Sequence, residues 1–503
     1  MSDLFLSHPA QAWAIDLTRT GIAAEAVETL DWADAFAEME ALEAGNVANP
    51  DEGRQVGHYW LRAPERAPTI AQGEAIGTTR DAVLQFAEDV RSGDIAAPDG
   101  HRFTDVIHIG IGGSALGPQL LVHALGDDHV GLHFVDNTDP DGVARVLAAV
   151  GDRLRHTLVV GVSKSGGTAE TKNGIALVQR AVEAAGLEVG GRFVAITGKG
   201  SKLDQHAEQN GWLARFEMWD WVGGRTSITS AVGLLPGALA GVDMRALLDG
   251  ARDMDDWTRN ADWRDNPAAL LAGSWHVLGN GNGDRAMVVL PYCDRLVLFS
   301  RYLQQLVMES LGKKLDLDGN VVHQGIAVYG NKGSTDQHSF VQQLRDGRND
   351  FFAVLVQVLS DGSGDLRPVE GRANAGDFLQ GFLLGTRRAL SETDRPVVTL
   401  TVPRLDEAVL GALIALFERA VGLYASLIGI NAYHQPGVEA GKKAAGQILA
   451  LSERVQDALG QHAQPLDVVA EAVSGDRIEV WYLLQRLAHT GRAVEGPDGW
   501  SAA

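Results

Sequence analysis

The pattern of apolar and polar positions changes partway along the chain. Up to about residue 95, apolar side chains recur at helical spacing, most regularly over residues 24–42, and a Gly/Asn/Pro break interrupts the pattern at residues 45–50. We therefore predict a helical N-terminal segment over residues 1–95.

From Asp105 onward, short apolar runs alternate with helical stretches. The runs that we predict as strands cover residues 106–109, 132–135, 157–160, 192–196 and 213–218. Strands separated by helices form right-handed βαβ units around a parallel sheet. The pattern predicts a first three-layer αβα domain over residues 96–245.

The same alternation returns after a helical stretch at residues 257–275. Apolar runs at residues 286–290, 351–358 and 397–402 predict a second α/β domain, with connecting helices, over residues 246–450. No low-complexity linker separates the two domains, so we expect them to pack directly. After Gly437 the pattern is helical, and residues 451–503 predict a helical C-terminal appendix. The expected fold class is α/β, with two αβα domains, parallel-rich sheets and helical segments at both ends.

The composition argues against several classes of function. A formal net charge of -22 without a Lys/Arg run disfavours a nucleic-acid partner. No run approaches the roughly 18 consecutive apolar residues of a membrane helix, and the opening Met-Ser-Asp-Leu-Phe-Leu does not resemble a signal sequence, so we expect a cytoplasmic protein without a membrane partner. The lone cysteine, Cys293, has no CxxC partner and predicts a packing thiol in a reducing compartment. The 15 histidines show no HExxH or other paired spacing, so neither a metal nor another cofactor is expected.

A glycine-rich turn, Gly110 to Ala115, directly follows the first predicted strand and enters a helix. Its backbone NH groups, with Gly113 and Ser114 at the centre, suit a phosphate. The same turn satisfies the dinucleotide pattern, and Asp136 follows the next strand where a ribose-binding acid would lie. A tight turn that only packs helix against strand is a third interpretation.

A second turn of this kind follows the third predicted strand and combines hydroxyls with glycines at a helix start. Backbone NH groups, hydroxyl donors, the helix dipole and a lysine would together bind one phosphate. The candidate residues are Ser163, Lys164, Ser165, Gly166, Gly167 and Thr168. The alternative is that Ser165 or Thr168 only caps the helix.

The second turn resembles the phosphate loop of SIS domains, the sugar-phosphate-binding α/β modules. Two such domains in tandem are the architecture of the phosphoglucose isomerase family, and the resemblance covers most of the chain through motifs in the family's order. Beyond the two turns, these motifs are residues 223–227, 304–313, 333–339 and 435–442. The resemblance implies two SIS-type domains and the interconversion of glucose 6-phosphate and fructose 6-phosphate through a cis-enediol, in glycolysis and gluconeogenesis.

Glu309 is the candidate base for moving a proton between neighbouring carbons. Residues 301–313 read as a helix with an apolar stripe, and Gln305 and Glu309, four apart, share a face that could line a pocket. Spacing alone favours a solvent-facing glutamate paired with Lys313. The family motif reverses this preference, and one desolvated carboxylate can remove the proton and return it.

The resemblance also assigns the remaining candidate roles. Arg225 would stabilise the charge on the enediolate oxygens, with a structural salt bridge as the alternative. His338 and Lys442 would open the sugar ring, and Gln435, like Gln305, would contact the substrate. In the family the equivalent of His338 comes from the partner subunit, which implies a homodimer with shared active sites.

This chain departs from the common family pattern at several positions. Its phosphate loop has fewer hydroxyls, and Asn431-Ala-Tyr-His-Gln435 replaces the commoner Asn-Pro-Phe-Asp-Gln. These departures place it in a divergent bacterial-type branch and leave open activity on mannose 6-phosphate. A nicotinamide oxidoreductase and a non-catalytic sugar-phosphate sensor are the competing interpretations.

Overall fold

A computed structural model describes residues 4–8 and 12–503 of the chain. It divides into two compact units, one ending at His434 and the other spanning Gln435–Ala503. The larger unit contains two sheets, each covered by helices on both faces.

The first sheet has five parallel strands in the order β4-β3-β5-β6-β7. The strands are β3 (Asp105–Ile109), β4 (Gly131–Val135), β5 (Thr157–Ser163), β6 (Phe193–Thr197) and β7 (Ala214–Glu217). All five predicted strands are therefore confirmed. The three central strands, β3, β5 and β6, are buried along their whole length, as expected for strands covered on both faces.

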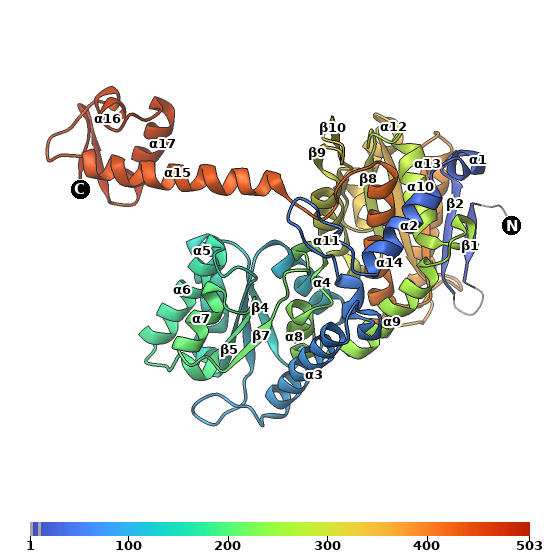
Figure 1. The fold of residues 1–503 in the computed structure, drawn as a ribbon, viewed down its shortest axis with the longest axis horizontal. Coiled ribbons are helices and arrows are strands. Elements are labelled where there is room, and N and C mark those ends of the chain that lie inside the picture. The colour runs from blue at the N-terminus through green and yellow to red at the C-terminus, as the bar shows by residue number, and fades with distance from the viewer. Residues whose placement is uncertain (1–3, 9–11) are drawn as a thin grey trace. The chain divides into compact units, whose positions relative to one another are not determined.

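Helices cover both faces of this sheet (Figure 1). Ile107 and Ile109 of β3 belong to the core formed with one helical layer, whereas Val106 belongs to the core on the opposite face. The first layer contains α5 (Pro140–Val150), α6 (Ala169–Ala184) and α7 (Lys202–Gln209); the second contains α3 (Ile70–Ser92), α4 (Leu116–Leu125) and α8 (Ala231–Leu239). This three-layer order places the two glycine-rich turns at the carboxyl ends of β3 and β5.

The second sheet has six strands in the order β1-β2-β13-β12-β8-β11. The strands are β1 (Phe5–Ser7), β2 (Ala14–Arg19), β8 (Ala286–Tyr292), β11 (Val328–Tyr329), β12 (Phe351–Val358) and β13 (Val397–Val402). β13, β12, β8 and β11 are parallel, and β2 adds to β13 in the antiparallel direction. β8, β12 and β13 confirm the three strands predicted for this domain.

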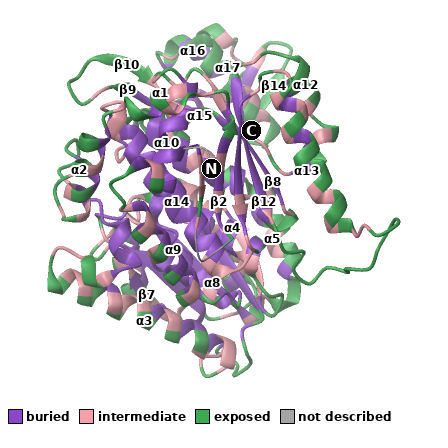
Figure 2. Cartoon of the chain, turned by 90° about the vertical axis from the view of Figure 1, so that its right-hand side faces the viewer, coloured by how far each residue is buried: buried purple, intermediate pink, exposed green. Residues whose placement is uncertain are grey.

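The second sheet is also a middle layer. One face packs against α12 (Val341–Asp346) and α13 (Ala375–Ser391). The other packs in the main core with α10 (Pro267–Leu278) and α14 (Glu407–Leu427). Figure 2 shows β8, β12 and α14 largely buried, while α13 carries exposed residues on its outer side.

One continuous apolar core joins the inner layers of both sheets, which explains the direct packing expected from the sequence. At its centre α14 crosses α9 (Met244–Thr258) closely: a Cβ on Gly411 would lie 2.0 Å from the carbonyl of Leu247, and one on Gly250 would lie 2.0 Å from that of Ala408. The length and composition of α14 would suit a membrane span, but 94% of its most apolar window is buried inside the protein. It is a core helix.

The prediction of a purely helical N-terminal segment was wrong. The segment contains α1 (Ala24–Glu28), α2 (Trp32–Glu43) and α3, but it begins with the hairpin β1–β2. Ile15 and Leu17 alternate with polar residues and are buried, so β2 covers the edge of β13. Between α1 and α2, the carboxylate of Asp31 accepts from the amide of Asp34 and starts a new helix.

The smaller unit differs from the predicted helical appendix in two respects. It begins at Gln435, so the expected boundary at residue 451 falls inside its long helix α15 (Pro436–Ala458). It also contains a β-hairpin besides its helices. Its other elements are α16 (Leu466–Ala472), α17 (Arg477–His489), β14 (Ala493–Gly496) and β15 (Gly499–Ala502). Trp500 of β15 packs in the small core of this unit with residues from all three helices.

Candidate active site

Glu309 lies at the end of a π-helical turn, η9 (Gln304–Glu309), which continues α11 (Phe299–Leu303). The apolar stripe predicted for this segment is confirmed: Leu303, Leu306 and Val307 are buried. They anchor the turn in the core, so the opposite side carries Gln305 and Glu309. The Gln305 amide Nε2 donates to Oε2 of Glu309 at 3.0 Å, as a shared face requires.

The helix predicted over residues 301–313 ends early. Gly312 follows the last turn, and Lys313 begins β9 (Lys313–Leu315), which forms a hairpin with β10 (Val321–Gln324). The ammonium group of Lys313 donates to the backbone carbonyls of Glu309 and Ser310, at 2.7 Å each. The side chain of Glu309 is only 19% exposed. The alternative of a solvent-facing Glu309 paired through its carboxylate with Lys313 is therefore wrong.

Arg225 is the second charged group of the site. It lies on η6 (Gly224–Thr226) with its side chain only 6% exposed, and its Nε donates to Oε2 of Glu309 at 3.1 Å. Its Nη1 donates to the carbonyl of Ala432 at 2.6 Å, and its Nη2 to that of His434 at 3.4 Å. Burial lowers the pKa of this guanidinium, and the Glu309 carboxylate opposes that shift. Arg225 thus forms the salt bridge that was the alternative interpretation, and its partner is the candidate base itself.

The first glycine-rich turn packs against both of these groups. A Cβ on Gly113 would lie 1.9 Å from the carbonyl of Gly224, so only glycine allows η3 (Gly112–Ser114) to approach η6. Gly112 has a φ of +57°, and a Cβ there would lie 3.1 Å from Nε2 of Gln305. The turn is therefore adjacent to Gln305 and Arg225, which meet at the carboxylate of Glu309.

The second turn leads from β5 into α6 and presents hydroxyl groups around two glycines. The Ser163 hydroxyl donates to that of Thr168 at 3.2 Å, the amide of Gly166 donates to Ser163 Oγ, and the amide of Gly167 donates to Ser165 Oγ. Thr168 is the N-cap of α6 but its side chain makes no capping bond. The capping interpretation expected the Thr168 hydroxyl to accept a hydrogen bond from an amide at the start of α6. It does not.

Lys164 extends from the second turn toward the segment that precedes Arg225. Its ammonium group donates to the carbonyls of Asp220 and Val222, at 3.1 and 2.9 Å. Burial lowers its pKa. These contacts link the second turn to the Arg225 segment. A direct contact of Lys164 with phosphate stays a prediction.

Two further segments border the site and were missed from the sequence. Asn431 donates to the carboxylate of Asp51 at 2.6 Å, and His434 Nε2 lies 3.7 Å from the same carboxylate. His434 stands where the commoner Asn-Pro-Phe-Asp-Gln has aspartate. This departure was the one feature of the sequence that could have pointed to His434. Burial lowers its pKa, and Asp51 opposes that shift. Asp51 itself directly follows the break at residues 45–50, and no role was predicted for it.

His338 makes no described contact with this cluster. His338 lies on η10 (Thr335–His338) with an exposed side chain, and among the described contacts of Glu309 it does not appear. The turn before it is fixed by Asp336, whose carboxylate accepts from the amides of Asn331 and Lys332. Gln435 is the N-cap of α15 and Lys442 lies in its second turn, both in the smaller unit. Their roles stay predictions.

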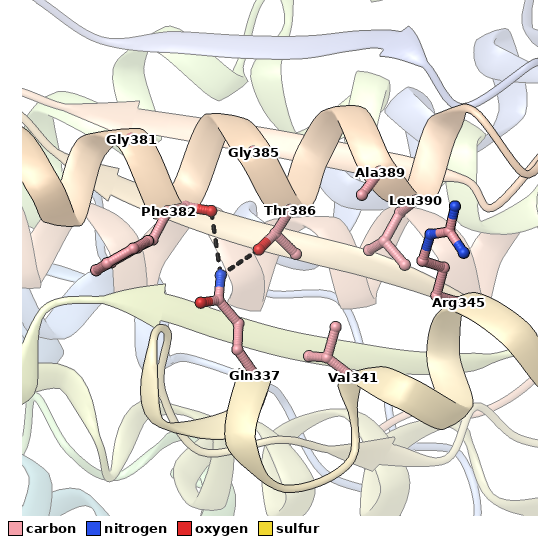
Figure 3. A pocket seen from close by; sticks show the side chains of 9 residues that line it. All are labelled: Gln337, Val341, Arg345, Gly381, Phe382, Gly385, Thr386, Ala389 and Leu390. Atoms are coloured by element: carbon pink, nitrogen blue, oxygen red, sulfur yellow. Dashed lines mark hydrogen bonds between the residues drawn. The ribbon is translucent and has the colours of Figure 1, made fainter.

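A cavity of about 320 Å³ lies between η10, α12 and α13 (Figure 3). Gln337, the neighbour of His338, donates across it to the hydroxyl of Thr386 and to the carbonyl of Phe382. None of its lining residues belongs to the Glu309 cluster. The cavity is lined by Gln337, Val341, Arg345, Gly381, Phe382, Gly385, Thr386, Ala389 and Leu390.

Two other candidates behave as ordinary structural residues. The carboxylate of Asp136, expected at the ribose of a dinucleotide, accepts from Gln119 at 2.9 Å and lies 3.6 Å from a guanidinium nitrogen of Arg301. Cys293 is half-buried, and burial raises the pKa of its thiol, which disfavours a nucleophilic role.

The arrangement provides a carboxylate held by a guanidinium and an amide beside a glycine-rich turn. In the described part of the chain both side-chain bonds to Glu309 fall on Oε2, and none falls on Oε1. A buried guanidinium next to it can stabilise negative charge that develops on a substrate oxygen.

Comparison with known proteins shows which family this chain resembles. The profile of the family described as "Phosphoglucose isomerase" matches residues 19–358 and 384–464. Glucose-6-phosphate isomerase of Thermosynechococcus vestitus is 54% identical over 501 residues, which cover 98% of this chain and 95% of the relative. That of Geobacter sp. (strain M21) is 61% identical over 427 residues, or 84% and 81% of the two chains. A glucose-6-phosphate isomerase crystal structure from Chlamydia trachomatis matches with a TM-score of 0.81 at 27% identity, covering 89% of this chain and 90% of that one.

Proposed function

The chain belongs to the phosphoglucose isomerase family, and on this basis we propose which of its residues carry the reaction. The reaction is the interconversion of glucose 6-phosphate and fructose 6-phosphate. The comparisons do not support the oxidoreductase or the non-catalytic sensor. The observation that carries the assignment of residues is the carboxylate of Glu309, held on one oxygen by Arg225 and Gln305.

Glu309 moves the proton between the two sugar carbons. In the open-chain aldose, its carboxylate takes the proton from carbon 2. The electron pair of that bond forms the double bond between carbons 1 and 2, the carbonyl electrons move to oxygen 1, and the enediolate takes a proton there to give a cis-enediol. Loss of the proton from oxygen 2 forms a carbonyl at carbon 2 while Glu309 returns its proton to carbon 1, which gives the ketose. The anchoring of Oε2 supports this role, because a carboxylate that keeps its orientation can serve both carbons of a planar intermediate.

Arg225 stabilises the negative charge of the enediolate oxygens. Its guanidinium is buried and fixed by the carbonyls of Ala432 and His434, so it needs no reorganisation when charge develops. Gln305 positions Glu309 and, with Gln435, hydrogen-bonds the sugar. These roles rest on the family motif together with the contacts of Arg225 and Gln305.

Phosphate binding falls to the second glycine-rich turn, assisted by the first. Ser163, Ser165 and Thr168 offer hydroxyls, and Gly166 and Gly167 offer amides, at the amino end of α6. Gly113 and Ser114 belong to the adjacent first turn, and Lys164 adds positive charge. The overall charge of -22 makes such a local anion site necessary.

Ring opening uses His338 and Lys442, and we infer that His338 acts in the site of a partner subunit. The exposure of its side chain supports this assignment. The exposed aromatic side chains on nearby α13 also support it, among them Phe382, which is 46% exposed. The carbonyl of Phe382 accepts a hydrogen bond from Gln337, the neighbour of His338. Exposed apolar side chains beside a catalytic loop are suited to a second copy of the chain. We propose a cytoplasmic homodimer.

The test is a coupled assay of fructose 6-phosphate conversion with purified Glu309→Gln. The substitution keeps shape and hydrogen bonding but removes basicity, so kcat should fall by about 10²- to 10⁴-fold. Glu40→Gln, at an exposed position of α2, is the matched control and should keep normal kcat. Near-normal turnover by Glu309→Gln would contradict the proposal.

A further inference from the structure

Three side chains with metal-ligating atoms meet at the surface beside the amino end of β5. They are Asp99, His101 and His156, and one ligand atom from each lies within 4.8 Å of the others. Asp99 Oδ1 lies 3.3 Å from Nδ1 of His101, and Asp99 Oδ2 lies 3.0 Å from Nε2 of His156. Ligands bound to one Zn²⁺ at 2.0–2.1 Å in tetrahedral geometry lie about 3.4 Å apart. Each histidine therefore lies near this distance from a different oxygen of Asp99, so the carboxylate faces both imidazoles.

The local backbone holds the three residues in place. Asp99 and His101 flank Gly100, whose φ of +83° turns the chain back, and the amide of Ala97 donates to the carbonyl of His101 at 2.8 Å. The carbonyl of His156 accepts from Thr104 at 2.9 Å. Both histidines are thus fixed through their backbones to neighbouring segments, so a metal would not have to order the chain.

The environment orients the carboxylate toward the histidines. The amide of His101 donates to Oδ1 of Asp99 at 3.2 Å, the kind of second bond that fixes a ligating carboxylate. The nearby cation Arg192 donates its hydrogen bonds to the backbone carbonyls of Leu154, Arg155 and Glu188. Arg192 therefore does not replace the two histidines as a hydrogen-bond partner of the Asp99 carboxylate.

We propose that Asp99, His101 and His156 form a binding site for a divalent transition-metal ion of the Zn²⁺ class. Two imidazoles and one carboxylate suit Zn²⁺, Ni²⁺ or Cu²⁺, whereas Mg²⁺ and Ca²⁺ prefer oxygen ligands alone. Water would complete the coordination, because Asp99 and His101 are exposed. No metal was expected from the sequence, because the two histidines come from distant segments and no spacing motif connects them.

The site has a stabilising role and takes no part in the reaction. His156 immediately precedes β5, whereas the phosphate-binding turn follows the other end of this seven-residue strand, about 20 Å away at the rise of an extended strand. A bound ion would tie the turn around Gly100 to the start of β5. It should therefore raise the temperature of unfolding without changing turnover.

The proposal is tested by titrating the full chain, stripped with a chelator, with Zn²⁺ in a calorimeter. We expect one ion bound per chain at this site, with His101→Ala, His156→Ala and Asp99→Asn each weakening its binding by at least about tenfold. His123→Ala, at an exposed position of α4, is the matched control and should bind Zn²⁺ as the unaltered chain does. Thermal unfolding should shift upward with Zn²⁺ in the control and not in the three variants.

Two results would overturn the proposal. Equal Zn²⁺ affinity in the three variants and the control would place any bound ion elsewhere. Binding weaker than about 1 mM by the unaltered chain would leave the cluster as a network of His–Asp ion pairs. Because two of the three side chains are exposed, the variants should fold normally, and circular dichroism before titration verifies this.

Discussion

Nε of Arg225 lies 3.1 Å from Oε2 of Glu309, while Nη1 of the same guanidinium donates to the carbonyl of Ala432. One planar group thus joins the candidate base to the chain segment that precedes the smaller unit. Arg225→Lys keeps a positive charge but cannot make these bonds in one plane. We expect kcat in the coupled assay to fall by about 10²- to 10³-fold, as on loss of a preorganised donor. An unchanged kcat would mean that charge alone suffices.

The hydroxyls of the second turn should act mainly in binding. Replacing Ser165 and Thr168 together with Ala should raise KM for fructose 6-phosphate much more than it lowers kcat, because phosphate is held equally in the ground and transition states. Thr18→Ala, an exposed hydroxyl on β2, is the control and should change neither constant. If KM of the double variant is unchanged, the phosphate lies elsewhere.

A shared active site predicts complementation between two inactive variants. Mixed Glu309→Gln and His338→Ala chains should form hybrid dimers in which one site is intact and the other carries both changes. At full exchange half of the dimers are hybrids, so activity should reach about a quarter of the unaltered level. Mass spectrometry of the mixture verifies subunit exchange. Absence of recovery despite exchange would mean that each chain builds its site alone.

Lys313 should make stability depend on pH. Burial, with the nearby Arg225, lowers the pKa of this ammonium group to about 7, whereas it titrates near 10.5 in the unfolded chain. Between these values the unfolded chain binds more protons, so this residue's contribution to the free energy of unfolding rises with pH, by at most about 1.4 kcal/mol per unit.

The unaltered chain is compared with the variant Lys313→Met. This change removes the titrating group and leaves the carbonyls of Glu309 and Ser310 without this donor. Denaturant unfolding of both proteins at pH 7 and pH 9 measures the difference in their free energies of unfolding. That difference should shift in favour of the unaltered chain at the higher pH. A difference that does not change with pH would contradict the assignment.

Sequence reasoning succeeded where burial imposes a simple pattern. Every residue of β6 is buried, and its Phe-Val-Ala-Ile is an uninterrupted apolar run that can be recognised without the structure. β2 shows the weaker signal of alternation, with buried Ile15 and Leu17, and was assigned to a helical segment. Its register depends on pairing with β13, which is distant in sequence.

Prediction of the site from the sequence was limited in the same way, by contacts between distant segments. The shared face of Gln305 and Glu309 follows from their spacing, and the carboxylate–amide bond confirms it. The roles of Asp51 and Lys313 could not be predicted, because their partners come from separate segments or from backbone carbonyls. A helical periodicity also cannot reveal that the last turn before Glu309 is π-helical.

The central claim is that one carboxylate, Glu309, removes and returns the same proton. The most direct measurement is the fate of deuterium at carbon 2 of glucose 6-phosphate, followed by NMR of the fructose 6-phosphate formed early in the reaction. A side chain that is 19% exposed exchanges its proton with water in competition with transfer, so part of the label should appear at carbon 1. Label lost entirely to water at the earliest times would contradict transfer by a single shielded base.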